Sequence, residues 1–203
     1  MTPEFWHDAT RHLARTDKVL RKLIRDFPDP DLDSRGGAFP TLARSIVGQQ
    51  ISVAAARSIW ARFARLAGRM TPARVAALSV ESLRACGFSL RKAEYVKDLA
   101  RHFASGAARP RRWPRMTDEA IIEELVAVRG IGRWTVEMFL IFHMKRPDVL
   151  PLDDIGLRRA LERHYNGGKP ITRNAMAKLG EPWAPYRSVA TWYLWRSLAP
   201  VTF

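Results

Sequence analysis

The sequence predicts an all-α protein, and three observations support this prediction. Apolar residues recur at a spacing of about 3.6 residues along most of the 203-residue chain. Side chains that cap helices stand directly before many of these stretches, and glycines stand directly after several of them. No stretch shows the convincing alternation of apolar and polar residues that predicts a strand.

The first two helices are expected at residues 3–16 and 17–26. The first has apolar residues at helical spacing. The second ends at Phe27-Pro28-Asp29-Pro30, because two prolines prevent a helix from continuing. Residues 31–37 are polar and rich in turn-forming side chains, so we expect them to link this part to the next unit.

Further helices are expected where a cap and an end signal enclose an apolar pattern. Ser52 caps one helix, which closes at Gly68. Thr71 is an N-cap followed by Pro72 at the first helical position, which is a strong start signal. The expected helices after residue 37 are 39–47, 53–66, one starting at 72, 78–86, 89–106, 117–128, one from the glycine turn to about 143, one capped by Asp153 or Asp154 and ending at about 164, 172–179 and 185–198.

The segment Ala107–Met116 interrupts this helical pattern, and it is rich in proline and arginine. Its simplest interpretation is a solvated connector between helices. Contact of Arg109–Arg115 with phosphate groups is the functional alternative, and the sequence leaves it open.

Composition narrows the class of protein. The chain has 34 Lys and Arg against 20 Asp and Glu, a net charge of +14, so it should attract a polyanion. A hydrophobic content of 47% and seven tryptophans exclude a disordered basic tail. The single cysteine, Cys86, excludes an intrachain disulfide framework, a cysteine-based zinc site and a four-cysteine iron–sulfur cluster. The longest apolar run, Met138–Phe142, is too short to span a membrane, and no signal-peptide core precedes it, so a cytoplasmic protein is expected.

A tight turn between two predicted helices is the first candidate functional segment. Leu125–Thr135 contains Gly130 and Gly132, two residues apart, which let the backbone turn sharply and expose amide N–H groups. Amide groups at a helix N-terminus bind anions, and a DNA phosphate suits them well. The charge and this turn together favour a phosphate-binding hairpin.

Two adjacent carboxylates, Asp153 and Asp154, form the second segment. Carboxylates at the start of a helix most often act as a cap and as partners of the helix dipole. The sharper hypothesis is that one of them faces a DNA-sized cleft and performs chemistry.

A cluster of aromatic residues is the third feature. Most tryptophans are expected in the core, although indole faces also bind cationic or electron-poor rings. The residues concerned are Trp134, Trp183, Tyr186, Trp192, Tyr193 and Trp195.

Four separated motifs in this order resemble the helix-hairpin-helix superfamily of DNA glycosylases, and its bacterial DNA-3-methyladenine glycosylase II branch in particular. The resemblance covers residues 38–200. The matching segments are Gly48–Ala55, Leu83–Ser89 with Lys92-Ala93, Val128–Thr135 and Asp148–Asp154.

The resemblance implies roles for single residues. Asp154 matches the catalytic carboxylate of the family, which leaves Asp153 as a cap or orienting residue. Trp134 and Trp195 match tryptophans that line the base pocket. Met138 stands where the nearest branch has a tyrosine, so that wall of the pocket should be less aromatic.

The resemblance also implies contacts with the DNA backbone. Gln50 falls at the wedge position, which fills the gap left by a flipped nucleotide. A monovalent cation, Na⁺ or K⁺, is expected on the backbone carbonyls of Val126, Val128 and Ile131. Residues expected to hold the DNA backbone are Gly130, Gly132, Arg133 and Thr135.

The implied fold has two helical lobes, with the DNA cleft between them. One lobe comprises residues 1–37 and 148–203, and the other comprises residues 38–147 with the helix-hairpin-helix at about 118–144. The implied activity is monofunctional hydrolysis of the N-glycosidic bond of alkylated purines in double-stranded DNA, by a monomer without an organic cofactor. Two alternatives stay open: a glycosylase for deaminated or oxidised bases, and a non-catalytic DNA-binding module.

Overall fold

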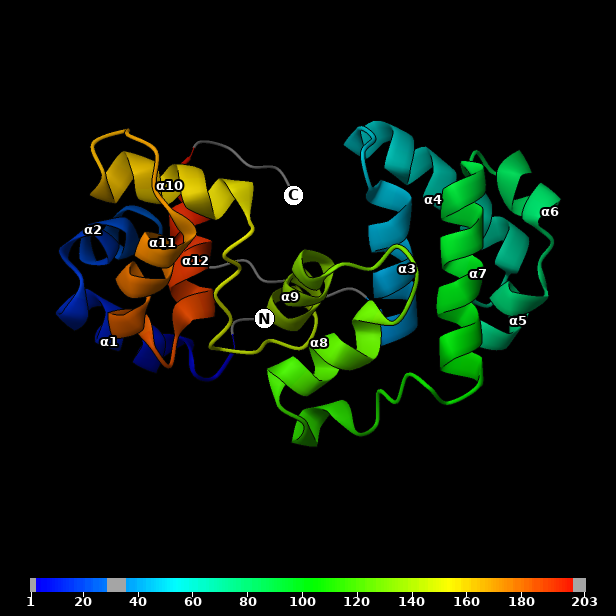
Figure 1. Cartoon of the computed structure of the whole chain (residues 1–203), viewed down its shortest axis with the longest axis horizontal. Helices are drawn as coiled ribbons and strands as arrows, with labels where there is room; N and C mark the ends of the chain where they lie inside the picture. Colours follow the sequence, from blue (N-terminus) through cyan, green and yellow to red (C-terminus); the bar gives the residue numbers. More distant parts are fainter. Residues whose placement is uncertain (1–2, 29–35, 199–203) are drawn as a thin grey trace. The chain divides into compact units, whose positions relative to one another are not determined.

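The structure, a computed structural model, describes residues 3–28 and 36–198, and the regular elements within these ranges are all helical (Figure 1). The predicted all-α class is therefore confirmed. The predicted linker at 31–37 lies largely outside the described residues. In chain order the α-helices are α1 (Trp6–Thr16), α2 (Lys18–Asp26), α3 (Ala38–Gly48), α4 (Val53–Ala67), α5 (Pro72–Ala77), α6 (Val80–Ala85), α7 (Leu90–Ala104), α8 (Asp118–Val126), α9 (Arg133–Phe142), α10 (Ile155–Tyr165), α11 (Arg173–Leu179) and α12 (Arg187–Arg196).

The two caps predicted from the sequence, Ser52 and Thr71, are present in the structure, and two further expected helices begin with caps of the same kind. Each of four hydroxyl side chains accepts a hydrogen bond from the backbone N–H three residues later, which satisfies one of the open donors of the first helical turn. Because such caps depend on neighbouring residues alone, the sequence places these helix starts closely. The four caps are Ser52, Thr71, Ser89 and Thr117.

The chain divides into two compact units. The terminal unit comprises residues 1–34 and 140–203, and the central unit comprises residues 35–139. The second boundary therefore lies inside α9, whereas the sequence-based division placed it after residue 147. Within the described part of the chain, none of the helices is long and apolar enough to cross a membrane.

The terminal unit is built around α12. Every residue from Ser188 to Trp195 is buried, so this helix lacks the polar face of an ordinary surface helix. It packs against α1, α2 and α10, which enclose it (Figure 1).

Most tryptophans of the two units are core residues, as expected. The buried ones are Trp6, Trp113, Trp183, Trp192 and Trp195.

In the central unit, α7 packs against α3, α5 and α6. The connector before α8 exposes its arginines, as expected of a solvated loop, but it also buries one tryptophan. Trp113, in a short 3₁₀ turn at Trp113–Arg115, is 2% exposed, and its indole N–H donates to Glu124 Oε1 at 2.6 Å. The connector is therefore anchored in the core by one aromatic side chain.

Candidate active site

Asp154 is the N-cap of α10. Its backbone is extended (φ −77°, ψ 123°), and its Oδ1 accepts the N–H of Leu157 at 2.5 Å. The residue is only 8% exposed. A carboxylate so far out of water needs hydrogen-bond donors, and the open amides of a helix N-terminus supply them together with a favourable dipole.

The same oxygen of Asp154 accepts a second hydrogen bond, from the indole of Trp195. Trp195 Nε1 donates to Asp154 Oδ1 at 2.7 Å across 41 residues of sequence. The indole lies flat against the ring of Phe142, with centroids 5.6 Å apart and an interplanar angle of 15°. The structure thus brings together two residues that the resemblance assigns to the site, and it adds Phe142, which the sequence showed only as part of an apolar run.

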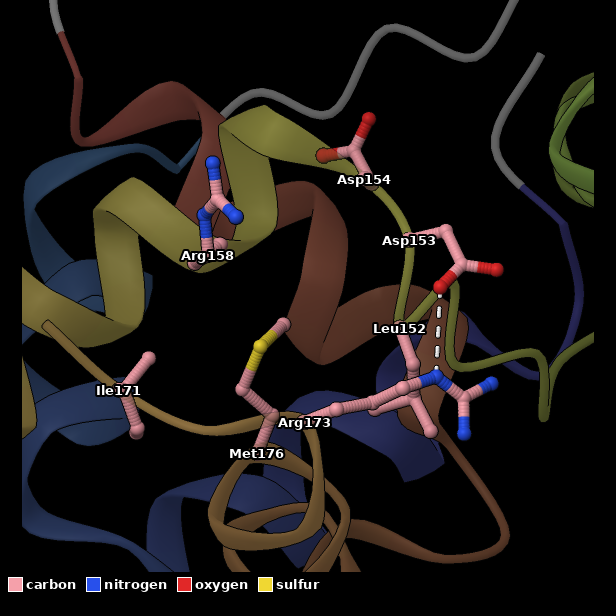
Figure 2. A pocket seen from close by; sticks show the side chains of 7 residues that line it. All are labelled: Leu152, Asp153, Asp154, Arg158, Ile171, Arg173 and Met176. Carbon is pink, nitrogen blue, oxygen red and sulfur yellow. Dashed lines mark hydrogen bonds and ion pairs between the residues drawn. The ribbon is translucent and has the colours of Figure 1, made fainter.

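Asp153 lies next in the chain but has a different environment. Its side chain is 53% exposed and pairs with Arg173 at 3.2 Å. Figure 2 shows the two carboxylates pointing in different directions. The expectation that Asp153 caps the helix is wrong, because Asp154 occupies the N-cap position itself.

A surface pocket of about 270 Å³ borders these two carboxylates in the terminal unit (Figure 2). Its wall combines apolar side chains with two arginines. The lining residues are Leu152, Asp153, Asp154, Arg158, Ile171, Arg173 and Met176.

The predicted hairpin connects α8 to α9 in the central unit. The Ile131 N–H donates to Val128 O at 3.1 Å inside the turn, and the Val136 N–H donates to Gly132 O at 3.2 Å where α9 begins. Gly130 has φ +83°, a conformation that costs other residues energy, whereas Gly132 does not have a positive φ. Only one of the two glycines is therefore required by the backbone conformation.

The hairpin is tied to the loop that carries Gln50. The side-chain amide of Gln49 donates to Gly130 O at 2.8 Å. Lys92 Nζ donates to Val47 O at 2.8 Å and to Gln49 O at 2.5 Å, and burial lowers the pKa of this lysine. Gln50 itself is exposed and has φ +55°.

These anchors are residues whose role the sequence analysis missed. Gln49 and Lys92 both stand inside the motifs that carry the family resemblance, and that was the available signal. Their partners are 81 and 45 residues away in sequence, respectively, so no local pattern shows the contacts.

The side chain of Arg133 is occupied within the protein. It forms two hydrogen bonds of 2.7 Å with Glu119 and one of 3.1 Å with the buried Glu137. The hydrogen bonds from Arg133 lower the pKa of Glu119. The expected contact of Arg133 with the DNA backbone stays a prediction. In the structure this side chain links Glu119 to Glu137.

The other predicted site residues of the central unit differ in how far their side chains are exposed to solvent. Trp134 is 46% exposed, Met138 is half-buried, and Thr135 is 8% exposed. An exposed indole at the start of α9 is unusual in a chain that buries most of its tryptophans. Trp134 is therefore the indole best placed to meet a ligand from solution.

Helices α8 and α9, joined by a hairpin that contains Gly130, form a helix-hairpin-helix motif, and the next helix begins at the buried Asp154. A family model described as "HhH-GPD superfamily base excision DNA repair protein" matches residues 43–185. The chain belongs to this superfamily, which confirms the resemblance found in the sequence.

Relatives and solved structures agree with this assignment. DNA-3-methyladenine glycosylase 1 of Schizosaccharomyces pombe is 35% identical over 197 residues, which cover 93% of this chain and 86% of the relative. The crystal structure of a DNA-3-methyladenine glycosidase from Bacillus halodurans has a TM-score of 0.88 at 34% identity and covers 94% of this chain and 89% of its own. The structure of the S. pombe enzyme in complex with abasic DNA has a TM-score of 0.80 at 32% identity, and the match covers 97% of this chain and 98% of the S. pombe chain.

Proposed function

We propose that this chain is a monofunctional DNA glycosylase that releases alkylated purines, of the 3-methyladenine and 7-methylguanine type, from double-stranded DNA in base excision repair. The observation that supports this proposal best is the buried carboxylate of Asp154, held by the Leu157 amide and the Trp195 indole. The names of the relatives specify one of these bases, 3-methyladenine.

DNA binding begins with charge. The net charge of +14 draws the chain to the phosphate backbone, and the backbone amides of the hairpin, at the N-terminus of α9, then hold one phosphate. A monovalent cation on the carbonyls of Val126, Val128 and Ile131 would add positive charge there. Neutral carbonyl oxygens are suitable ligands for such a cation, and Val126, as the last residue of α8, has a carbonyl that the helix itself leaves open.

A base inside a duplex is out of reach, so the target nucleotide must rotate out of the stack, at a cost of about a few kcal/mol. Gln50 enters the space left behind. An alkylated purine carries a positive charge, and the indoles of Trp134 and Trp195 attract such a ring by cation–π interaction, worth about 0.5–2 kcal/mol.

Bond cleavage then needs little acid catalysis, because the cationic base is a good leaving group. As the N-glycosidic bond breaks, its electron pair leaves with the base and the sugar becomes positively charged. The ionised Asp154 stabilises this charge and orients a water molecule, whose oxygen bonds to the sugar carbon while its proton is released. The products are a free base and an abasic site.

A lyase step is not expected. Bifunctional members of the superfamily carry a lysine nucleophile at the position of Trp134, and an indole cannot form a Schiff base. Borohydride treatment with abasic DNA should therefore trap no covalent adduct, and a robust adduct would contradict the monofunctional assignment. We further propose that the chain acts in the cytoplasm as a monomer.

The decisive experiment compares two neighbouring substitutions on methylated duplex DNA. Asp154→Asn keeps a side chain that caps helices well but loses the negative charge, so base release should fall by about 10²–10³-fold. Asp153→Asn is the matched control, because this carboxylate is exposed and pairs with Arg173 instead of taking part in the hydrogen bonds that hold Asp154. It should leave base release close to that of the unaltered chain.

The outcomes separate the alternatives. Undiminished release by Asp154→Asn refutes the mechanism. Release from duplexes with deaminated or oxidised bases, but not from methylated duplex, replaces the substrate assignment. Binding without release from any of these duplexes identifies a DNA-binding module.

A further inference from the structure

Gly156 occupies the second position of α10, two residues after Asp154. Alanine is the better residue for a helix by about 1 kcal/mol, so a glycine at this position calls for a physical reason. Conformational freedom is not that reason, because Gly156 does not have a positive φ. The explanation must be the space that a side chain would take.

A side chain at this position would crowd the hydrogen bond between Trp195 and Asp154. A Cβ atom on Gly156 would lie 3.0 Å from Trp195 Cδ1, 3.1 Å from Trp195 Nε1 and 3.1 Å from Asp154 Oδ1. The last two atoms are the donor and the acceptor of the 2.7 Å bond between indole and carboxylate. All three distances are shorter than most contacts that Cβ atoms make in proteins.

Neither partner can easily move away from an added methyl group. The indole of Trp195 is stacked on Phe142 and belongs to α12, which is enclosed by other helices. The carboxylate of Asp154 is bound to the N–H of Leu157 through the same Oδ1. A Cβ at position 156 would therefore push the indole or the carboxylate aside by a few tenths of an ångström, which lengthens and weakens the 2.7 Å hydrogen bond between them.

We propose that Gly156 is a positioning residue: the absence of its side chain lets the Trp195 indole bond to Asp154 and so fixes the orientation of that carboxylate. The part of this inference that concerns catalysis rests on the proposed function. The part that concerns geometry does not depend on it.

The first test is spectroscopic, in the full chain labelled with ¹⁵N. The indole resonance of Trp195 is identified as the one that Trp195→Phe removes. Gly156→Ala should move this resonance upfield, because the hydrogen bond from the indole N–H to its charged acceptor weakens. Gly48→Ala is the control, since a Cβ there meets nothing within 4 Å, and it should leave the resonance in place. An unchanged resonance in Gly156→Ala overturns the proposal.

The second test measures single-turnover release of base from methylated duplex. Gly156→Ala and Trp195→Phe should each slow release by about 10-fold or more, with affinity for abasic DNA within twofold of the unaltered chain. The double variant should be no slower than the slower single variant, because both changes act on the same hydrogen bond. Losses that multiply would refute a shared cause.

Folding provides a third test if Gly156→Ala proves unstable. Phenylalanine lacks Nε1 but keeps a Cδ1 atom, so it removes one of the three close contacts. Relative to Trp195→Phe alone, the double variant should therefore regain part of the stability that Gly156→Ala loses. A double variant that regains none of it refutes the steric argument. If Asp154→Asn stays active while the indole resonance still shifts, the proposed function fails and the geometric inference stands.

Discussion

Substituting Gly130 by alanine should destabilise the protein strongly, for two separable reasons. The residue has φ +83°, and an L-residue forced into the left-handed region loses about 1–2 kcal/mol. The new Cβ would also lie 2.1 Å from Cδ2 of the Tyr95 ring, and overpacking of this kind costs about 1–3 kcal/mol. The expected loss in unfolding free energy is the sum, about 2–5 kcal/mol.

The matched control is the other hairpin glycine. Gly132 does not have a positive φ, and a Cβ on it meets no atom within 4 Å, so Gly132→Ala should stay within about 0.5 kcal/mol of the unaltered chain. Urea denaturation followed by circular dichroism measures both variants. Adding Tyr95→Ala to Gly130→Ala should remove the collision and leave the conformational cost.

This reasoning is refuted if Gly130→Ala is as stable as Gly132→Ala. The steric part is refuted if Gly130→Ala lowers the unfolding free energy as much in a chain that already carries Tyr95→Ala as it does in the unaltered chain. Either result would mean that the hairpin tolerates a side chain where the geometry leaves no room for it.

Three further predictions concern other parts of the molecule. Trp134→Ala should abolish base release with little change in the denaturation midpoint, because its indole is 46% exposed; unchanged release would make this residue structural. Lys92→Met leaves the carbonyls of Val47 and Gln49 without their charged donor and should cost about 1–3 kcal/mol in a denaturation experiment, whereas no loss would show that water replaces the lysine. Burial and two nearby cations lower the pKa of His164 below the ordinary value of 6.5, so the unfolded chain takes up the proton first as the pH falls. Unfolding free energy should therefore decrease from pH 7.5 towards pH 5.5, and His164→Gln should flatten that dependence; an equal slope in the variant would exclude His164 as its source.

Helix starts were predictable from the sequence because the forces that set them are local. A hydroxyl at Ser89 or Thr117 reaches the amide three residues later whatever the rest of the chain does. The connector before α8 was not predictable in the same way. Its prolines and arginines indicate a solvated loop, and the arginines are exposed, yet the single indole of Trp113 packs against Phe103 and Phe139 and anchors the loop to the core.

The candidate site was predictable in its residues and not in its contacts. Resemblance assigned Asp154 over Asp153, while capping preferences alone favoured neither. The hydrogen bond from Trp195 joins helices that are 41 residues apart, and the bond from Gln49 to Gly130 spans 81 residues. Contacts of this kind depend on how helices pack, which no spacing rule within one helix contains.

The enclosure of α12 has a consequence for how this enzyme can be altered. Eight successive buried positions, Ser188–Trp195, leave little room for neutral change around the indole that holds the carboxylate. Trp134 and the half-buried Met138 lie on a face of α9 where substitutions disturb less packing. Laboratory evolution towards new damaged bases should therefore accumulate its changes along α9, while α12 stays almost invariant.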